Sequence, residues 1–118
     1  MLNPVDSPVP GRLTGVLFID GAFRAGSGTA LPVVNPATGQ EVGTIPATQP
    51  DELNDAVTAA RRAFKTWSRL NARKRADALH RLGDAIAADA DAMARIMTAE
   101  QGKPMNEARG EILKLADA

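Results

Sequence analysis

The stretch VVNPATGQEVGTI, residues 33–45, decides how the first half of the chain folds. Apolar and β-branched residues stand on both sides of NPATG, residues 35–39, in which proline presets φ and glycine supplies the left-handed position of a turn. The pattern predicts a hairpin with strands at residues 31–34 and 41–45, and Pro46 closes the second strand.

A second hairpin is predicted just before this one. The segments VLFI, residues 16–19, and AFR, residues 22–24, flank Asp20-Gly21. Asp-Gly between two such segments is a strong hairpin signal, because both turn positions need a positive φ. GSG, residues 26–28, then breaks the chain. Two successive hairpins are therefore expected before residue 47.

Beyond residue 47 the sequence is rich in alanine, arginine, aspartate and leucine, with apolar residues at helical spacing. Thr48 with Asp51 three places on resembles a capping box, and Pro50 suits the first turn of a helix. Asn71 is expected to cap a second helix. The two apolar stripes are Leu53, Val57, Ala60, Phe64 and Trp67 on the first helix, and Ala72, Ala76, Leu79, Leu82 and Ile86 on the second.

The last third predicts further helix. A break is expected near residues 88–91, and Gly102-Lys103-Pro104 is a clear helix stop. Pro104 can open a final helix, whose inward face would be Met105, Ala108, Ile112 and Leu115. The prediction for the segment is therefore N-terminal β-hairpins followed by three to four α-helices.

The composition favours a thin core. Aromatic residues are only 3% of the chain, and alanine supplies much of the apolar content, so little apolar surface would be buried per residue. The final helix has an apolar face but no ending signal, which indicates an incomplete chain. We expect residues 16–118 to be the N-terminal part of a larger domain, and residues 1–15, with three prolines, to be a flexible tail.

Charge and cysteine content argue against several classes of protein. The formal net charge is zero, which speaks against a dedicated nucleic-acid binder and gives no drive towards an anionic membrane. No window approaches the ~20 apolar residues of a membrane span. Without cysteine the sequence has no disulfide, no thiolate metal site and no cysteine nucleophile. The lack of disulfides fits the reducing environment of the cytoplasm.

Most candidate binding residues have a simpler interpretation. His80 is the only histidine and lacks converging partners, so a solvated or packing role is favoured. The glycine-bearing loops at residues 26–28 and 39–43 lack the full dinucleotide or phosphate-loop pattern, which favours turns. Core packing is likewise favoured over a cofactor site for the methionines, which are Met93, Met97 and Met105.

The charged candidates are also ambiguous. A basic stretch could bind phosphate, but helix geometry spreads it over more than one face, which favours a solvated surface; its members are Arg69, Arg73, Lys74, Arg75 and Arg81. Glu100, Glu107 and Glu111 could perform acid–base chemistry only in a pocket that shifts their pKa values, and the sequence indicates none. We therefore assign no catalytic and no cofactor-binding residue to this chain.

Five segments, taken in order, resemble the aldehyde dehydrogenases. LFIDG, residues 17–21, resembles the opening strand and turn of the family, and VVNPATGQEV, residues 33–42, its NPATG turn and following strand. Residues 55–67 and 79–86 are similar to its first and second long helices. TAEQGKP, residues 98–104, followed by Glu107-Ala108, resembles the E-x-G-K-P…E segment, in wording most like the succinate-semialdehyde dehydrogenases. The resemblance runs from about residue 17 to residue 118.

The resemblance implies an α/β parent fold. It also implies that the parent enzyme, a homo-oligomer, oxidises an aldehyde to a carboxylic acid with NAD or NADP, and the most similar branch acts on semialdehydes. In the family a cysteine thiolate attacks the aldehyde, hydride passes to the cofactor, and a glutamate-activated water hydrolyses the thioester. An asparagine and a backbone amide stabilise the oxyanion. None of these parts is in this sequence. The chain is expected to be inactive scaffold that binds no cofactor by itself and needs the rest of the dehydrogenase as its partner.

One site of the family has matching positions here. Some members hold a structural monovalent cation with a backbone carbonyl near the strand before NPATG and an acidic side chain after the start of the GKP helix. The matching positions are Val33 and Glu111, with glutamate where many members have aspartate. A third ligand would be a backbone oxygen from a later part of the family's sequence.

Two other functions remain open. The chain could be a stand-alone helical protein-interaction module, which would need a folded monomer and a final helix that covers itself. It could also be a small basic-helix nucleic-acid binder, which zero net charge opposes and which salt-sensitive DNA binding would reveal.

Overall fold

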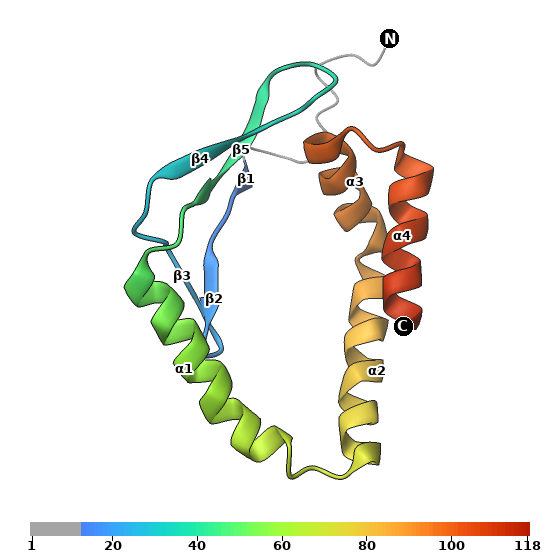
Figure 1. Cartoon of the computed structure of the whole chain (residues 1–118). Coiled ribbons are helices and arrows are strands. Elements are labelled where there is room, and N and C mark those ends of the chain that lie inside the picture. Colours follow the sequence, from blue (N-terminus) through green and yellow to red (C-terminus); the bar gives the residue numbers. More distant parts are fainter. Residues whose placement is uncertain (1–12) are drawn as a thin grey trace.

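The computed structural model describes residues 13–118, which begin with short strands and end with four helices (Figure 1). β2 (Leu17–Ile19) and β3 (Ala22–Arg24) form an antiparallel pair. β4 (Ala30–Val34) and β5 (Glu41–Pro46) form a second antiparallel pair. Both predicted hairpins are confirmed, because Asp20, Gly21 and Gly39 have positive φ angles of 57°, 77° and 69°.

A short additional strand, β1 (Leu13–Thr14), pairs in parallel with β5, so that the larger sheet has the order β1-β5-β4. The expected tail at residues 1–15 lies largely outside the described residues. Its boundary needs a correction, since Gly15 donates a backbone hydrogen bond of 2.7 Å to the Thr44 carbonyl. Residues 13–15 are therefore held by the sheet, because the edge of β5 offers a hydrogen-bonding partner that no local sequence pattern predicts.

The cap of the first helix, α1 (Pro50–Trp67), lies one residue later than predicted. Gln49 occupies the cap position, and its backbone N–H donates to Glu52 Oε2 at 2.8 Å. Thr48 and Asp51 have the same spacing as Gln49 and Glu52, so the capping pattern was assigned one residue too early. α2 (Ala72–Ala88) begins as predicted, since the Asn71 side chain accepts from the Lys74 N–H at 2.9 Å.

The remaining two helices form a hairpin. α3 (Ala90–Gln101) follows α2 after a break at Asp89, and Gly102, whose φ is 73°, caps its C-terminal end. α4 (Met105–Asp117) then folds back and packs against α3 and α2 (Figure 1). The break near residues 88–91, the stop at Gly102 and the final helix are all confirmed. No helix among residues 13–118 is long and apolar enough to cross a membrane.

Small side chains make the core where α3 and α4 meet. Ala94 and Ala108 are fully buried, and Ile112 is 5% exposed. The predicted inward face of α4 is correct for Ala108 and Ile112, whereas Leu115 is 57% exposed and contradicts it. Leu115 lies near the end of α4, where the described chain offers nothing to cover it. Gly83 of α2 lets α4 come close, because a Cβ at that position would overlap the Ala116 carbonyl oxygen.

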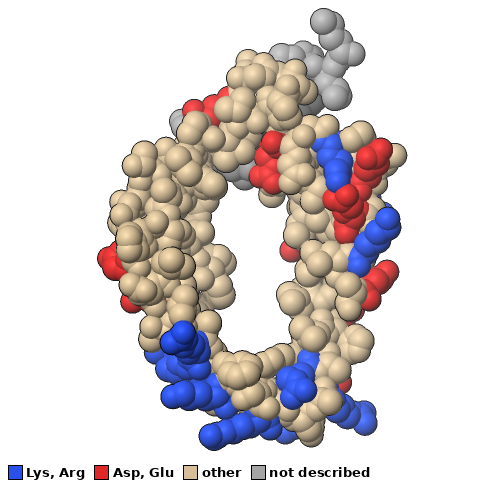
Figure 2. All heavy atoms as spheres, viewed as in Figure 1, with Lys and Arg blue, Asp and Glu red and all other residues tan. Residues whose placement is uncertain are grey.

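Residues 13–118 form an open ring rather than a packed globule. The hairpins and α1 form one arm, and α2 to α4 form the other (Figure 1). The arms are joined by residues 68–71 at one end, and at the other end Pro36 of the NPATG turn lies against Gly102. Figure 2 shows the opening between them. The radius of gyration is 17.3 Å, against about 13 Å for a compact domain of this length.

Most of the predicted apolar stripes are exposed along the ring. On α1 the exposed large residues are Leu53, Val57, Phe64 and Trp67, and on α2 they are Leu79 and Leu82. The helical periodicity of both stripes is confirmed, but their burial within this chain is not. The pattern of a core-facing helix is therefore present without a core to face.

Candidate functional site

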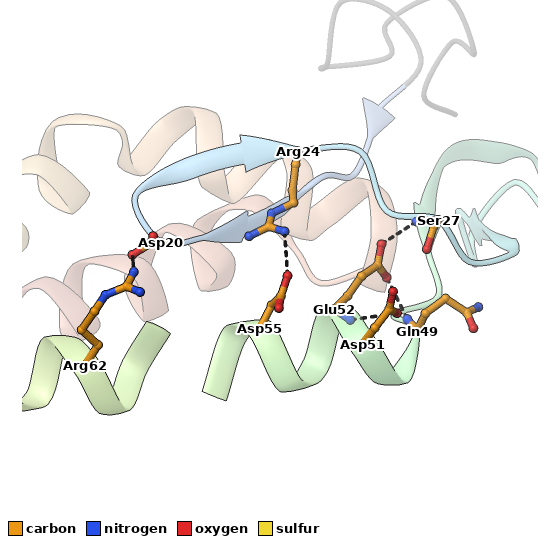
Figure 3. A network of polar contacts seen from close by, with 8 residues as sticks. All are labelled: Asp20, Arg24, Ser27, Gln49, Asp51, Glu52, Asp55 and Arg62. Atoms are coloured by element: carbon orange, nitrogen blue, oxygen red, sulfur yellow. Dashed lines mark hydrogen bonds and ion pairs between the residues drawn. The ribbon is translucent and has the colours of Figure 1, made fainter. Parts of the chain in front are cut away.

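A buried carboxylate ties the loop before β4 to the start of α1 (Figure 3). Glu52 is 8% exposed, and its two oxygens accept backbone N–H bonds from Ser27 at 2.7 Å and from Gln49 at 2.8 Å. The hydrogen bond from Gln49, and next that from Ser27, lower the pKa of the Glu52 carboxyl below its usual value. A carboxylate held ionised by two donors is a structural tie rather than a general base.

Two ion pairs continue this contact along α1 (Figure 3). Arg24 of β3 reaches Asp55 at 3.2 Å, and Arg62 pairs with Asp20 of the hairpin turn. A shallow concavity of about 200 Å³ lies between the hairpin and α1, and it is lined by Ile19, Asp20, Arg24, Asp55, Thr58, Ala59 and Arg62. Both of its carboxylates already pair with a guanidinium, so the lining offers no free charge for a ligand.

A second concavity, of about 210 Å³, lies where the larger sheet meets the end of α3. Val33, one of the two predicted cation ligands, is in its lining together with Thr14, Gly15, Thr44 and Ile45. The carboxylate in this lining is Glu100, which sequence reasoning did not connect with Val33. Val33 lies on β4 and Glu100 on α3, so only the folded chain brings these two residues to one concavity.

Glu111, the other predicted cation ligand, is not in that lining. It lies on α4 and forms an ion pair with Lys103, which lies two residues before the first residue of that helix. Within residues 13–118 no group of three or more histidine, aspartate or glutamate side chains could hold a metal ion. The cation site at Val33 and Glu111 therefore stays a prediction, with Lys103 occupying one oxygen of Glu111.

The other sequence candidates do not converge. His80 is exposed on α2, while Glu100 and Glu111 lie in different surroundings. Met93, Met97 and Met105 are half-buried between helices, and Met105 Sδ lies 3.9 Å from Thr98 Oγ1, which fits a packing role. Sequence reasoning missed Glu52, because Gln49 is not among the residues (serine, threonine, aspartate and asparagine) that usually begin a capping box.

Neither of the two concavities described above has the size of a dinucleotide pocket. The two concavities measure about 200 and 210 Å³, below the roughly 300–1,000 Å³ of ligand pockets. No glycine-rich turn joins a strand to a helix here, since Gly26 and Gly28 lead into β4. What the arrangement does is hold two hairpins and four helices in a fixed order, with apolar faces left open.

Comparison with known proteins identifies this arrangement. The model of the aldehyde dehydrogenase family matches residues 23–118. A 3-sulfolactaldehyde dehydrogenase of Pseudomonas putida is 45% identical over 104 residues, which are 87% of this chain and 21% of the relative. An NADP(+) succinate-semialdehyde dehydrogenase of Escherichia coli is 43% identical over 88 residues, 75% of this chain and 18% of the relative.

Solved structures agree with the sequence match. The crystal structure of an NAD-dependent aldehyde dehydrogenase from Sinorhizobium meliloti superposes with a TM-score of 0.85 at 34% identity, covering 95% of this chain and 24% of that one. Strands and helices in this order, at this likeness, define an α/β dehydrogenase segment. The chain belongs to the aldehyde dehydrogenase family. It spans about a fifth of the length of the relatives it matches.

Proposed function

We propose that this chain is the N-terminal part of the cofactor-binding domain of an NAD- or NADP-dependent semialdehyde dehydrogenase, and that it serves as scaffold. The observation that carries the proposal is the pair of apolar stripes on α1 and α2, which lie exposed along an open ring. Such faces on a segment one fifth the length of its relatives suit a structure that is covered by more protein.

The finer features of the proposal come from the relatives. Relatives named for glutarate, succinate and aspartate semialdehydes lie at 41–43% identity, which supports a semialdehyde as substrate. The cofactor, the cysteine nucleophile and the oxyanion donors would belong to the rest of the parent enzyme, a homo-oligomer. The proposed location of the parent enzyme is the cytoplasm, where a cysteine nucleophile is kept reduced.

The cation site is a separate part of the proposal. The Val33 carbonyl and the Glu111 carboxylate would bind a monovalent cation once a further backbone oxygen completes the site. Because Glu111 pairs with Lys103, the cation would replace an ammonium already present. Its test is the potassium or sodium dependence of thermal stability in the parent enzyme, with Glu111→Gln removing that dependence.

A chimera tests the scaffold role. This chain would replace the matching fifth of the Escherichia coli succinate-semialdehyde dehydrogenase, and reduction of NAD and NADP would be followed with succinate semialdehyde. We expect the chimera to be active and the 118-residue chain alone to be inactive. Activity of the isolated chain, or a folded chimera without activity, would contradict the proposal.

A matched pair of variants makes the test specific to the stripe. Leu53 is 58% exposed on the stripe of α1, and Asn54 is its exposed neighbour. In the chimera, Leu53→Lys is expected to reduce the yield of active enzyme about tenfold or more, because the buried ammonium would be unpaired. Asn54→Lys is expected to leave it nearly unchanged. Equal effects would instead favour a stand-alone interaction module.

A further inference from the structure

The turn between β2 and β3 contains the only Asp-Gly pair of the sequence. Nine aspartates occur in the chain, and Asp20 alone is followed by glycine. Glycine has no Cβ, so the backbone nitrogen that follows Asp20 is the least hindered of the nine. A Cβ built on Gly21 would meet nothing within 4 Å, so the surrounding structure leaves this side of the turn open.

The surroundings of Asp20 also differ from those of the other aspartates. Its φ is 57°, and within residues 13–118 no other residue except glycine has a positive φ. Its side chain is 57% exposed, so water reaches the carboxyl group. Of the other eight aspartates, Asp6 lies outside the described residues and seven lie in helices or, like Asp89, between two of them. A helix fixes the peptide plane that follows each of its residues.

An exposed Asp-Gly pair can react without any catalyst. The backbone nitrogen of Gly21 attacks the carboxyl carbon of the neutral Asp20 side chain, an N–C bond forms, and the carboxyl OH leaves as water with the proton of the nitrogen. The product is a five-membered succinimide ring. Water then adds to one of the two ring carbonyls and opens the ring to aspartate or to isoaspartate, in which the main chain runs through the β-carbon. The two steps together consume no oxidant, reductant or cofactor.

The fold provides one restraint on this reaction. The carboxylate of Asp20 is paired with the guanidinium group of Arg62, and Figure 3 shows it turned towards α1. The ion pair needs the ionised carboxylate, whereas ring closure needs the neutral acid turned towards the Gly21 nitrogen. Arg62 therefore opposes the reaction by charge and by orientation. Because both side chains are more than half exposed, the restraint is modest.

We propose that Asp20-Gly21 is a site of spontaneous isomerisation to isoaspartate, and that the ion pair with Arg62 slows the reaction. Isoaspartate adds one methylene to the backbone of a two-residue turn, which disturbs the register in which Ile19 pairs with Ala22. It also attaches the carboxylate directly to the α-carbon, which shortens the group that reaches Arg62. The modification therefore loosens the hairpin from α1.

Tryptic peptides allow the site to be tested with an internal control. Residues 13–24 form one tryptic peptide, in which Asp20 is the only acidic residue, and residues 76–81 form another, in which Asp77 is. The 118-residue chain is incubated at physiological temperature and neutral pH, and isoaspartate in each peptide is measured by chromatographic retention and electron-transfer fragmentation. We expect it to accumulate about tenfold faster at Asp20 than at Asp77, which precedes alanine in α2. Equal rates at the two residues would overturn the assignment of the site.

Substitutions on α1 test the restraint, both in the 118-residue chain and in the chimera, whose activity shows independently that the arm is folded. R62Q is expected to raise the rate at Asp20 about twofold to threefold, towards that of a synthetic peptide of residues 13–24. The matched control R61Q removes the same charge from the exposed neighbouring residue and should leave the rate unchanged. R62K keeps the charge and should retain most of the restraint. Equal rates for R62Q and R61Q in both proteins would overturn the role of Arg62.

Discussion

At the scale of the residue, Glu52 fixes how the two halves of one arm meet. Its carboxylate takes one N–H from the loop before β4 and one from the start of α1. A β-strand region and a helix are thus joined through a single side chain. Burial opposes its ionisation, but the two donors outweigh burial, and its pKa is lowered overall.

Glu52→Gln is expected to destabilise this arm more than Glu107→Gln does. Both residues lie in the first turn of a helix, so each change removes the same favourable interaction with the macrodipole. Only Glu52 also loses a charged acceptor for two N–H groups. Thermal unfolding of the chimera measures both, and equal shifts of Tm would contradict the role of Glu52.

The pH dependence of this difference has a definite sign. A carboxyl whose pKa is lowered on folding binds fewer protons in the folded state, so stability rises with pH across that interval. The advantage of Glu52 over the substituted glutamine is therefore fully present above the unfolded pKa of about 4.3 and is lost as pH falls through the lowered folded pKa. A Tm difference that stays constant down to strongly acidic pH would contradict the assignment.

At the scale of the element, α2 and α4 come together through a glycine. A Cβ at Gly83 would overlap the Ala116 backbone, whereas a Cβ at Gly110 of α4 would meet nothing within 4 Å. The two positions are therefore a matched pair. Helix propensity favours alanine at both, and only the approach of the helices distinguishes them.

Gly83→Ala is expected to destabilise the chimera by about 1–3 kcal/mol, because α4 must move away. Gly110→Ala is expected to stabilise it by about 0.5–1 kcal/mol. Denaturant unfolding measures both changes. If both substitutions stabilise the protein, α2 and α4 are farther apart than described.

The elements that could be predicted are those whose signals are local. Asp20-Gly21, Gly39 and Gly102 adopt the left-handed conformations that their residue types favour, and Asn71 caps α2 through its own side chain. The predicted cap of α1 was one residue too early, because Thr48 with Asp51 and Gln49 with Glu52 have the same spacing of three residues. Strand β1 and the neighbourhood of Val33 and Glu100 depend on contacts between distant segments, which no local pattern carries.

At the scale of the whole molecule, apolar periodicity predicted helices correctly but not their burial. An apolar stripe such as Leu79 and Leu82 is typical of a helix face that packs against protein. The pattern does not indicate which part of a polypeptide packs there. The thin core expected from the composition is confirmed, since no large side chain among residues 13–118 is fully buried.

The isolated 118-residue chain is expected to self-associate or to behave as a molten globule. Its exposed stripes should bind a hydrophobic dye, and its thermal unfolding should be broad. Analytical ultracentrifugation and calorimetry would test this. A sharp, cooperative transition from a monomer would show that the ring covers itself.

The contact between Pro36 and Gly102 has a consequence for the order of assembly. It closes a loop of about 66 residues, for which the closure entropy is on the order of 4 kcal/mol at room temperature. Small side chains meet at this joint and bury little surface to offset that entropy. Each arm can therefore form before the joint, because contacts within an arm close shorter loops. On the proposed function, the remaining part of the parent enzyme would supply the buried surface that this joint lacks.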